Sequence, residues 1–141
     1  MLVWTKDLSV GVVEIDDQHR ELFGRINRLL KAIDENAAAD EIRTLFKFLE
    51  TYVVKHFGDE QRYMDQYEMY GYSDAARHKS EHASFISSIG EFRADLEAAP
   101  PSQQFVTEFA KWMINWYIMH IQHIDKGLGA FLRKVFPVLG R

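Results

Sequence analysis

Four segments of this chain carry apolar residues at intervals of three and four, the spacing that gathers them on one face of an α-helix. The pattern predicts helices over about 16–35, 42–70, 74–99 and 105–126, separated by short breaks. Short connections force neighbouring helices to run antiparallel. We therefore expect an all-α fold, an antiparallel up-down-up-down four-helix bundle.

The two ends of the chain fall outside this pattern. Residues before Asp16 alternate loosely and indicate an extended arm that packs Trp4 and Val12 onto the bundle, while Asp16 or Asp17 can cap the first helix. A length of 141 residues with 47% hydrophobic content suits one core. We expect a single domain over 1–141, made of an N-terminal arm at 1–15, a bundle at 16–126 and a short helical tail at 127–141.

Composition narrows the classes of function. The formal net charge is -4 and the basic residues are scattered, which argues against a nucleic-acid partner. No run of 18 apolar residues and no signal-like start is present, so we expect a soluble, cytoplasmic protein without a membrane contact. The chain has no cysteine, so any metal must be held by His, Asp or Glu.

Histidines stand at inward positions in all four predicted helices. His56 and Glu60 in HFGDE, and His78 and His82 in HKSEH, are four residues apart and so share a helix face. His19 continues the apolar stripe of the first predicted helix, and His120, the first residue of HIQHID, continues that of the fourth. In an up-down-up-down bundle, all these positions fall at the same end.

Such a cluster needs a partner, because an unpaired buried polar group costs about 1–3 kcal/mol. A single inward histidine is more often a core residue bonded to a carbonyl, but here every helix contributes. Five imidazoles and two carboxylates are too many for one tetrahedral zinc, and calcium and magnesium prefer oxygen ligands. Two transition-metal ions fit better, with Glu60 and the Asp of HIQHID as bridges. Iron is the expected metal, and manganese or zinc would occupy the site only artificially.

The Trp4 arm, DDQH, HFGDE, HKSEH and HIQHID together resemble the hemerythrin family, in particular the stand-alone bacterial hemerythrins. The resemblance implies a non-heme di-iron centre that binds dioxygen reversibly, with an oxo or hydroxo bridge between two iron ions. It implies that one iron is held by His78, His82 and His120, the other by His19 and His56, and that Glu60 and Asp125 bridge both.

Two residues depart from the family pattern near the expected oxygen pocket. Better-known members have leucines where this chain has Tyr117 and Gln122. Counted at 100° per residue, Tyr117 faces the core near the metals, and Gln122 lies at the margin of that face. Either side chain can donate a hydrogen bond or admit water; alternatively, Tyr117 is a core aromatic and Gln122 is solvated. We interpret His123 as lying behind the ligands or on the surface.

The resemblance favours an oxygen-binding protein for storage, delivery or scavenging, not an enzyme. A redox enzyme at the same site, such as a peroxidase or a nitric-oxide or peroxide detoxifier, is an alternative suggested by the polar pocket candidates. An oxygen sensor acting through a separate partner is another. Dioxygen and an oxygen-consuming enzyme are the expected partners, and a monomer is the expected state.

Overall fold

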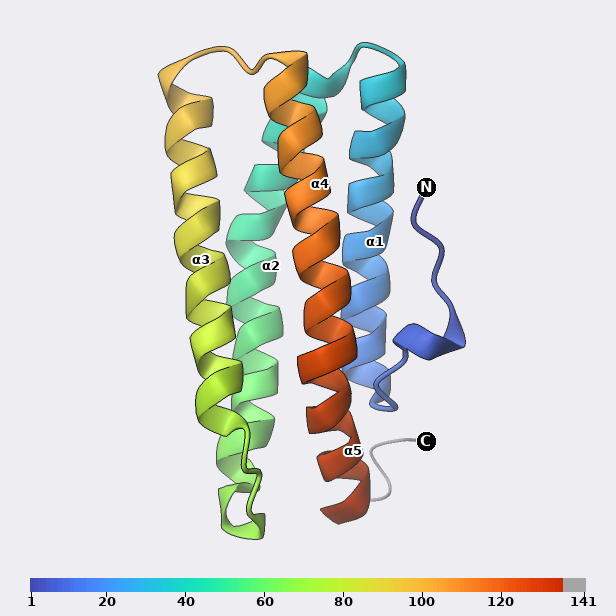
Figure 1. Cartoon of the computed structure of the whole chain (residues 1–141), viewed down its shortest axis with the longest axis vertical. Helices are drawn as coiled ribbons and strands as arrows, with labels where there is room; N and C mark the ends of the chain where they lie inside the picture. Colours follow the sequence, from blue (N-terminus) through green and yellow to red (C-terminus); the bar gives the residue numbers. More distant parts are fainter. Residues whose placement is uncertain (136–141) are drawn as a thin grey trace.

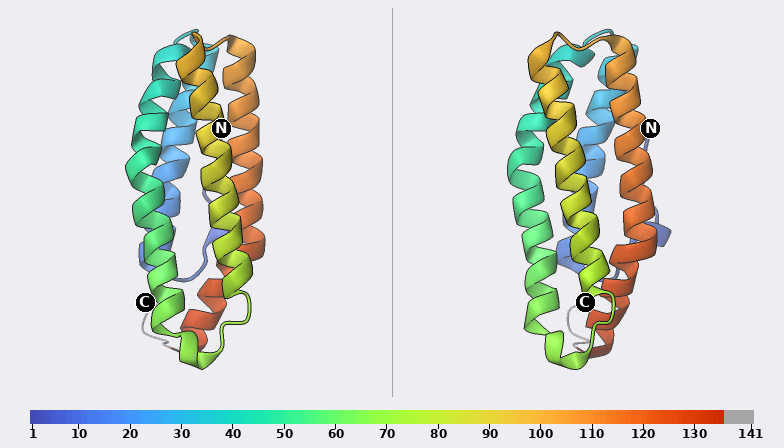
Figure 2. Two further views of the ribbon diagram at one scale, coloured as in Figure 1. Left: turned by 90° about the vertical axis from the view of Figure 1, so that its left-hand side faces the viewer. Right: turned by 60° about the vertical axis from the view of Figure 1, so that its left-hand side comes forward.

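Four long helices form the body of the computed structural model, which describes residues 1–135. They are α1 (Val13–Asp34), α2 (Ala38–Gln66), α3 (Ala75–Ala98) and α4 (Gln103–His120). The helices lie side by side along the long axis and alternate in direction (Figures 1 and 2). The predicted antiparallel four-helix bundle is confirmed.

The fourth helix does not end where the sequence pattern predicts. A π-helical turn at Ile121–Asp125 follows α4, and the chain continues without a break into α5 (Lys126–Val135). The glycines at 127 and 129 therefore lie inside a helix and do not loosen it. The expected helical tail is present as far as Val135, and residues 136–141 lie outside the described range.

The N-terminal arm is mostly extended, with a short 3-10 turn at Lys6–Leu8. As predicted, it packs Trp4 against Phe23, with ring centroids 5.4 Å apart, and it buries Val12. The arm also crosses α5 so closely that a Cβ at Gly129 would overlap the carbonyl of Val10. Glycine is therefore required where the arm meets α5.

The predicted cap of the first helix is wrong. Helix α1 begins at Val13, before Asp16, and has no side-chain cap. The Asp16 carboxylate instead accepts hydrogen bonds from Ser9 Oγ at 2.5 Å and from the Val10 backbone N–H at 2.8 Å. Asp16 thus fastens the arm to the first turn of α1.

The apolar core runs along the whole bundle, and in the half that contains the α1–α2 and α3–α4 connections (upper part of Figure 1) the described buried side chains are all apolar. Leu29, Leu45 and Phe109 are among its fully buried side chains. Toward the opposite end, where α1 and α3 begin and α2 and α4 end, buried polar residues lie among the apolar ones. This end holds the candidate site.

Candidate metal centre

Seven polar side chains fill the bundle interior at this end, and every long helix supplies at least one of them. None is more than 4% exposed. They are His19 from α1, His56 and Glu60 from α2, His78 and His82 from α3, His120 at the end of α4 and Asp125 at the end of the π turn. These are the seven residues that the sequence predicts to meet.

The π turn explains how Asp125 reaches the cluster. In a regular α-helix, a residue five positions after His120 would be rotated about 140° away from it. A π turn closes its hydrogen bonds between residues i and i+5, so it brings residues five apart onto one face. Asp125 Oδ1 accordingly lies 3.0 Å from His120 Nε2. The helix does not have to end for the carboxylate to point inward.

The two carboxylates lie between two groups of histidines. Asp125 directs Oδ2 at His19 Nε2, at 3.0 Å, and Oδ1 at His78 Nε2 and His120 Nε2, both at 3.0 Å. Glu60 directs Oε1 at His56 Nε2, at 2.7 Å, and Oε2 at His78 Nε2, at 2.8 Å. One oxygen of each carboxylate thus serves each group.

The donor atoms form two sets that share both carboxylates. Within each set, the candidate ligand atoms lie within 4.8 Å of one another. One set comprises His78, His82, His120, Glu60 and Asp125, and the other comprises His19, His56, Glu60 and Asp125. The histidines divide as in the ligand sets implied by the resemblance. We call these sets the three-histidine side and the two-histidine side.

The cluster contains nearly all the unsatisfied buried polar atoms of the described chain. Among residues 1–135, every buried side-chain nitrogen or oxygen without a hydrogen-bond partner belongs to these seven residues, except Arg93 Nε. The Nε2 atoms of the five histidines and the carboxylate oxygens lie close together without hydrogen-bond partners, and Nδ1 of His19, His82 and His120 is unpaired as well. Leaving so many donors unpaired would be costly. Cations between them would satisfy the Nε2 atoms and the carboxylates together, so the residues fit a metal pair.

Charge at the site also favours cations. Burial opposes ionisation of Asp125, but His120, His19 and His78 outweigh it and hold the pKa of Asp125 well below its usual value. Burial would lower the pKa of His78, yet the carboxylates of Asp125 and Glu60 raise it to about 9. Burial lowers the pKa of His82 to about 3. The carboxylates therefore stay ionised, and His82 presents a neutral nitrogen suited to a metal.

Two ring nitrogens on the far side of the histidines, those of His56 and His78, have hydrogen-bond partners. His56 Nδ1 lies 2.6 Å from Gln18 Oε1, and Gln18 Nε2 donates to Asp59 Oδ2 at 2.7 Å. Tyr72 Oη lies 3.2 Å from His78 Nδ1. Such contacts fix the ring orientation and leave the other nitrogen free for a metal. Sequence reasoning missed all three partners, although Gln18 and Asp59 directly precede His19 and Glu60 in their motifs.

Aromatic rings cover the three-histidine side. Phe57 stacks on His82 with ring centroids 3.8 Å apart, and Trp116 stacks on His120 at 4.4 Å. Trp116 also packs against Phe85, at 4.4 Å. These contacts make Trp116 a wall of the site as well as a core residue.

The two polar departures from the family pattern have different positions. Tyr117 is buried, with its ring edge against His19 at a centroid distance of 5.5 Å, as predicted from its rotation. Gln122 is exposed on the outer face of the π turn, so its position does not support a place in the pocket. His123 is also exposed, in line with its interpretation as a surface residue.

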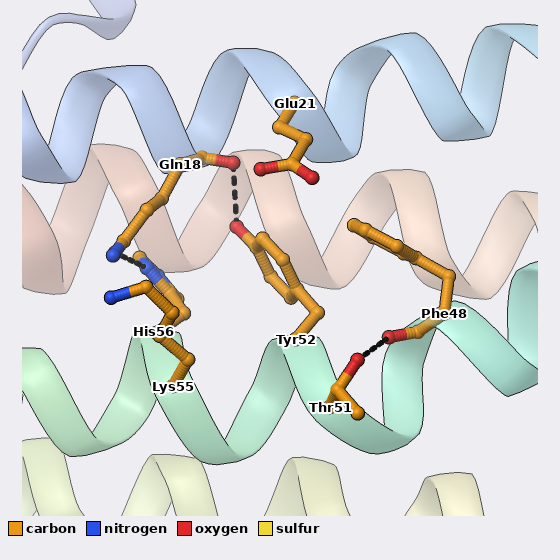
Figure 3. A pocket seen from close by; sticks show the side chains of 7 residues that line it. All are labelled: Gln18, Glu21, Phe48, Thr51, Tyr52, Lys55 and His56. Carbon is orange, nitrogen blue, oxygen red and sulfur yellow. Dashed lines mark hydrogen bonds between the residues drawn. The ribbon is translucent and has the colours of Figure 1, made fainter.

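A hollow of about 160 Å³ lies on the two-histidine side, between α1 and α2 (Figure 3). His56 forms part of its inner wall, and Gln18 and Tyr52 lie beside it. Figure 3 shows the Tyr52 hydroxyl directed at Gln18, where it donates to the Gln18 backbone carbonyl at 2.7 Å. Burial raises the pKa of Tyr52 and of Tyr117 well above 10, so both phenols stay protonated.

Fold and site together define a helical-bundle metal protein whose two histidine groups share two carboxylates. Comparison with known proteins agrees. The hemerythrin HHE cation binding domain matches residues 10–132. The bacteriohemerythrin of Stenotrophomonas maltophilia is 31% identical over 129 residues, covering 89% of this chain and 78% of the relative. The hemerythrin of Phascolopsis gouldii is 32% identical over 125 residues, covering 87% and 86%. The chain therefore belongs to the hemerythrin family.

A solved structure supports the same assignment. The crystal structure of wild-type hemerythrin matches with a TM-score of 0.73 and 26% identity, over 94% of this chain and 98% of that one. The two relatives are named bacteriohemerythrin and hemerythrin. Within residues 1–135, no helix is both long and apolar enough to cross a membrane.

Proposed function

We propose that this protein binds dioxygen reversibly at a pair of non-heme iron ions, for oxygen storage, delivery or scavenging. One observation carries the proposal: both carboxylates are shared between the two histidine groups. Each carboxylate has one oxygen for each of two ions, as a bridging ligand requires. A single metal site would leave one group of histidines buried and unpaired.

The ligand roles follow from the two sides. His78, His82 and His120 would hold one iron, and His19 and His56 the other, with Glu60 and Asp125 bridging both. An oxo or hydroxo group would complete the bridge. The three-histidine side then offers five protein atoms and the two-histidine side four. With fewer protein ligands, an ion on the two-histidine side would leave room for dioxygen to bind.

The donor set suits iron and reversible chemistry. When bound, the iron pair supplies the electrons that dioxygen accepts and recovers them on release. Five neutral imidazoles against two carboxylates place less negative charge around the metals than the four-glutamate sets of di-iron carboxylate proteins. Weaker stabilisation of highly oxidised iron favours release of dioxygen over cleavage of its bond. Zinc or manganese remain artificial occupants in this proposal.

The surrounding side chains orient the ligands and restrict water. Gln18 and Tyr72 contact the outer nitrogens of His56 and His78 and so hold the inner nitrogens toward the metals. Phe57 and Trp116 shield the three-histidine side. The peroxidase or detoxification alternative has less support, since Gln122 points to solvent.

The test is anaerobic reconstitution with ferrous iron, followed by oxygen exposure. We expect two iron ions per chain and a visible absorption that appears with oxygen and disappears when oxygen is removed. Immediate, irreversible oxidation accompanied by turnover of hydrogen peroxide would instead favour an enzyme. Iron at one per chain would refute the paired site. The monomeric state stays a prediction, testable by sedimentation of the loaded protein.

A further inference from the structure

Two buried tyrosines from different helices meet beside the metal centre. Tyr52 of α2 and Tyr117 of α4 place their hydroxyl oxygens 2.8 Å apart. Tyr52 is 7% exposed and Tyr117 is 2% exposed. Their hydroxyl groups are therefore shielded from bulk water and depend on each other and on protein partners.

The direction of both hydrogen bonds can be assigned. Tyr52 Oη lies 2.7 Å from the backbone carbonyl of Gln18, and a carbonyl can only accept. The single proton of the Tyr52 hydroxyl is therefore donated to Gln18. The bond between the tyrosines then requires Tyr117 as donor and Tyr52 as acceptor. The two hydrogen bonds therefore run in one direction, from Tyr117 to Tyr52 and from Tyr52 to the Gln18 carbonyl.

The two hydrogen-bonded tyrosines lie on the two-histidine side. The Tyr117 ring meets His19 edge-on, with centroids 5.5 Å apart and planes at 87°. The Tyr52 ring stacks on His56 at 5.2 Å and 21°. Both histidines belong to the side with fewer protein ligands. The Tyr117 ring thus lies against a histidine of the two-histidine side, while its hydroxyl proton is directed at Tyr52.

We propose that Tyr52 is a positioning residue. It accepts the hydrogen bond of the Tyr117 hydroxyl and so directs that hydroxyl proton away from the two-histidine side. This inference rests on the proposed function. It explains how a tyrosine can occupy a place where the family pattern has leucine: with its proton engaged, Tyr117 acts toward dioxygen as a non-donating side chain. Tyr52, on another helix, therefore sets the chemical character of Tyr117.

Proton supply matters because irreversible oxidation consumes protons. Two ferrous ions and one dioxygen give two ferric ions and one hydrogen peroxide only if two protons are added. A hydroxyl directed into the site would donate a hydrogen bond to the bound oxygen and pass on a proton taken up from water, while the phenol itself stays protonated. Keeping that proton engaged with Tyr52 favours release of dioxygen over loss of hydrogen peroxide.

The substitution Tyr52→Phe tests the proposal by removing the acceptor while keeping the ring. We expect the iron-loaded variant to oxidise irreversibly about tenfold faster than the natural protein, equivalent to about 1.4 kcal/mol in the activation barrier. The double variant Tyr52→Phe/Tyr117→Phe should return to the natural rate, because no freed hydroxyl remains. A double variant as fast as Tyr52→Phe would overturn the proposal, since altered packing or water entry would then be the cause.

Tyr63→Phe is the matched control. Tyr63 also lies in α2, is buried and donates its hydroxyl to a carboxylate, Glu14, at 2.6 Å. Loss of this hydroxyl removes a comparable hydrogen bond that does not involve Tyr117. We expect no change in oxidation rate, and an equal acceleration in Tyr63→Phe and Tyr52→Phe would contradict a specific role for Tyr52.

Nuclear magnetic resonance of the zinc-loaded full chain gives a readout independent of iron and dioxygen. The Tyr117 hydroxyl proton should exchange slowly and show a nuclear Overhauser effect to the Tyr52 ring, and Tyr52→Phe should abolish both. A contact from that proton to the His19 ring in the natural protein would refute the assignment. If this pattern is found but oxygen binding is irreversible, the proposed function fails while the proton assignment stands.

Discussion

Replacing Gln18 by leucine tests whether residues behind the histidines set the metal affinity. The leucine keeps most of the buried volume but removes two hydrogen bonds. Gln18 Oε1 accepts from His56 Nδ1 at 2.6 Å, and Gln18 Nε2 donates to Asp59 Oδ2 at 2.7 Å. The first bond fixes the tautomer of His56 that leaves Nε2 free, and the second fixes Gln18 itself.

The magnitude follows from these two bonds. At about 1 kcal/mol net each, their loss amounts to about 2 kcal/mol. Because each 1.4 kcal/mol is tenfold in affinity, we expect metal binding on the two-histidine side to weaken roughly thirtyfold. This value lies within the 10- to 100-fold range typical of residues that orient a metal ligand. The lost hydrogen-bond energy destabilises mainly the metal-loaded protein, because the His56 imidazole can rotate or change tautomer when no metal is bound.

The assay is competition for ferrous iron or zinc against a coloured chelator, resolved into two binding steps. Gln104→Leu is the matched control, because Gln104 also donates to a carboxylate, Glu108 at 3.0 Å, but at the surface. We expect only Gln18→Leu to weaken one of the two steps. Equal affinities for both variants would refute the reasoning, as would an equal loss at both metal positions.

Three further outcomes are expected. His120→Ala should lower iron occupancy whereas His123→Ala, at an exposed position, should not, and equal losses by metal analysis would contradict the ligand assignment. Gly129→Ala should reduce the free energy of unfolding by about 1–3 kcal/mol in urea titrations, since the new Cβ overlaps the backbone of the arm. Gly127→Ala, with open space around the new Cβ, should instead raise it by about 0.5–1 kcal/mol, and a loss there would refute the packing argument. In the metal-free protein, the raised pKa of His78 means that its ion pairs stabilise fully below pH 6.5 and are lost as pH rises through about 9. The melting temperature should fall across that window, and the same fall in His78→Gln would show that another group is responsible.

The bundle and its seven clustered residues could be predicted because both depend on position along regular helices. Spacing of three and four identifies the inward face, and antiparallel alternation identifies which ends meet. His56 with Glu60, and His78 with His82, lie in uninterrupted α-helix, where a rotation of 100° per residue holds. Their inward direction therefore followed from counting alone.

Counting failed where the helix changes type. Gln122 was placed at the pocket margin by assuming α-helical rotation after His120, but the π turn begins at Ile121. Each residue of a π turn rotates less, so Gln122 remains outside while Asp125 comes inward. The stretch HIQHID contains no glycine or proline to mark such a turn. Partners such as Gln18 and Asp59 were missed for another reason: they meet across two helices, 41 residues apart.

The π turn also affects how relatives of this chain are aligned. It uses one residue more than an α-helical turn to return to nearly the same face, so a relative with a regular helix would present its carboxylate after one residue fewer. An alignment that allows gaps only in loops would then pair Asp125 with the wrong neighbour. A chain could look as if it lacked a bridging carboxylate that it in fact carries. For the segment between His120 and Asp125, equivalent residues are better identified by the helix face they occupy than by their column in a sequence alignment.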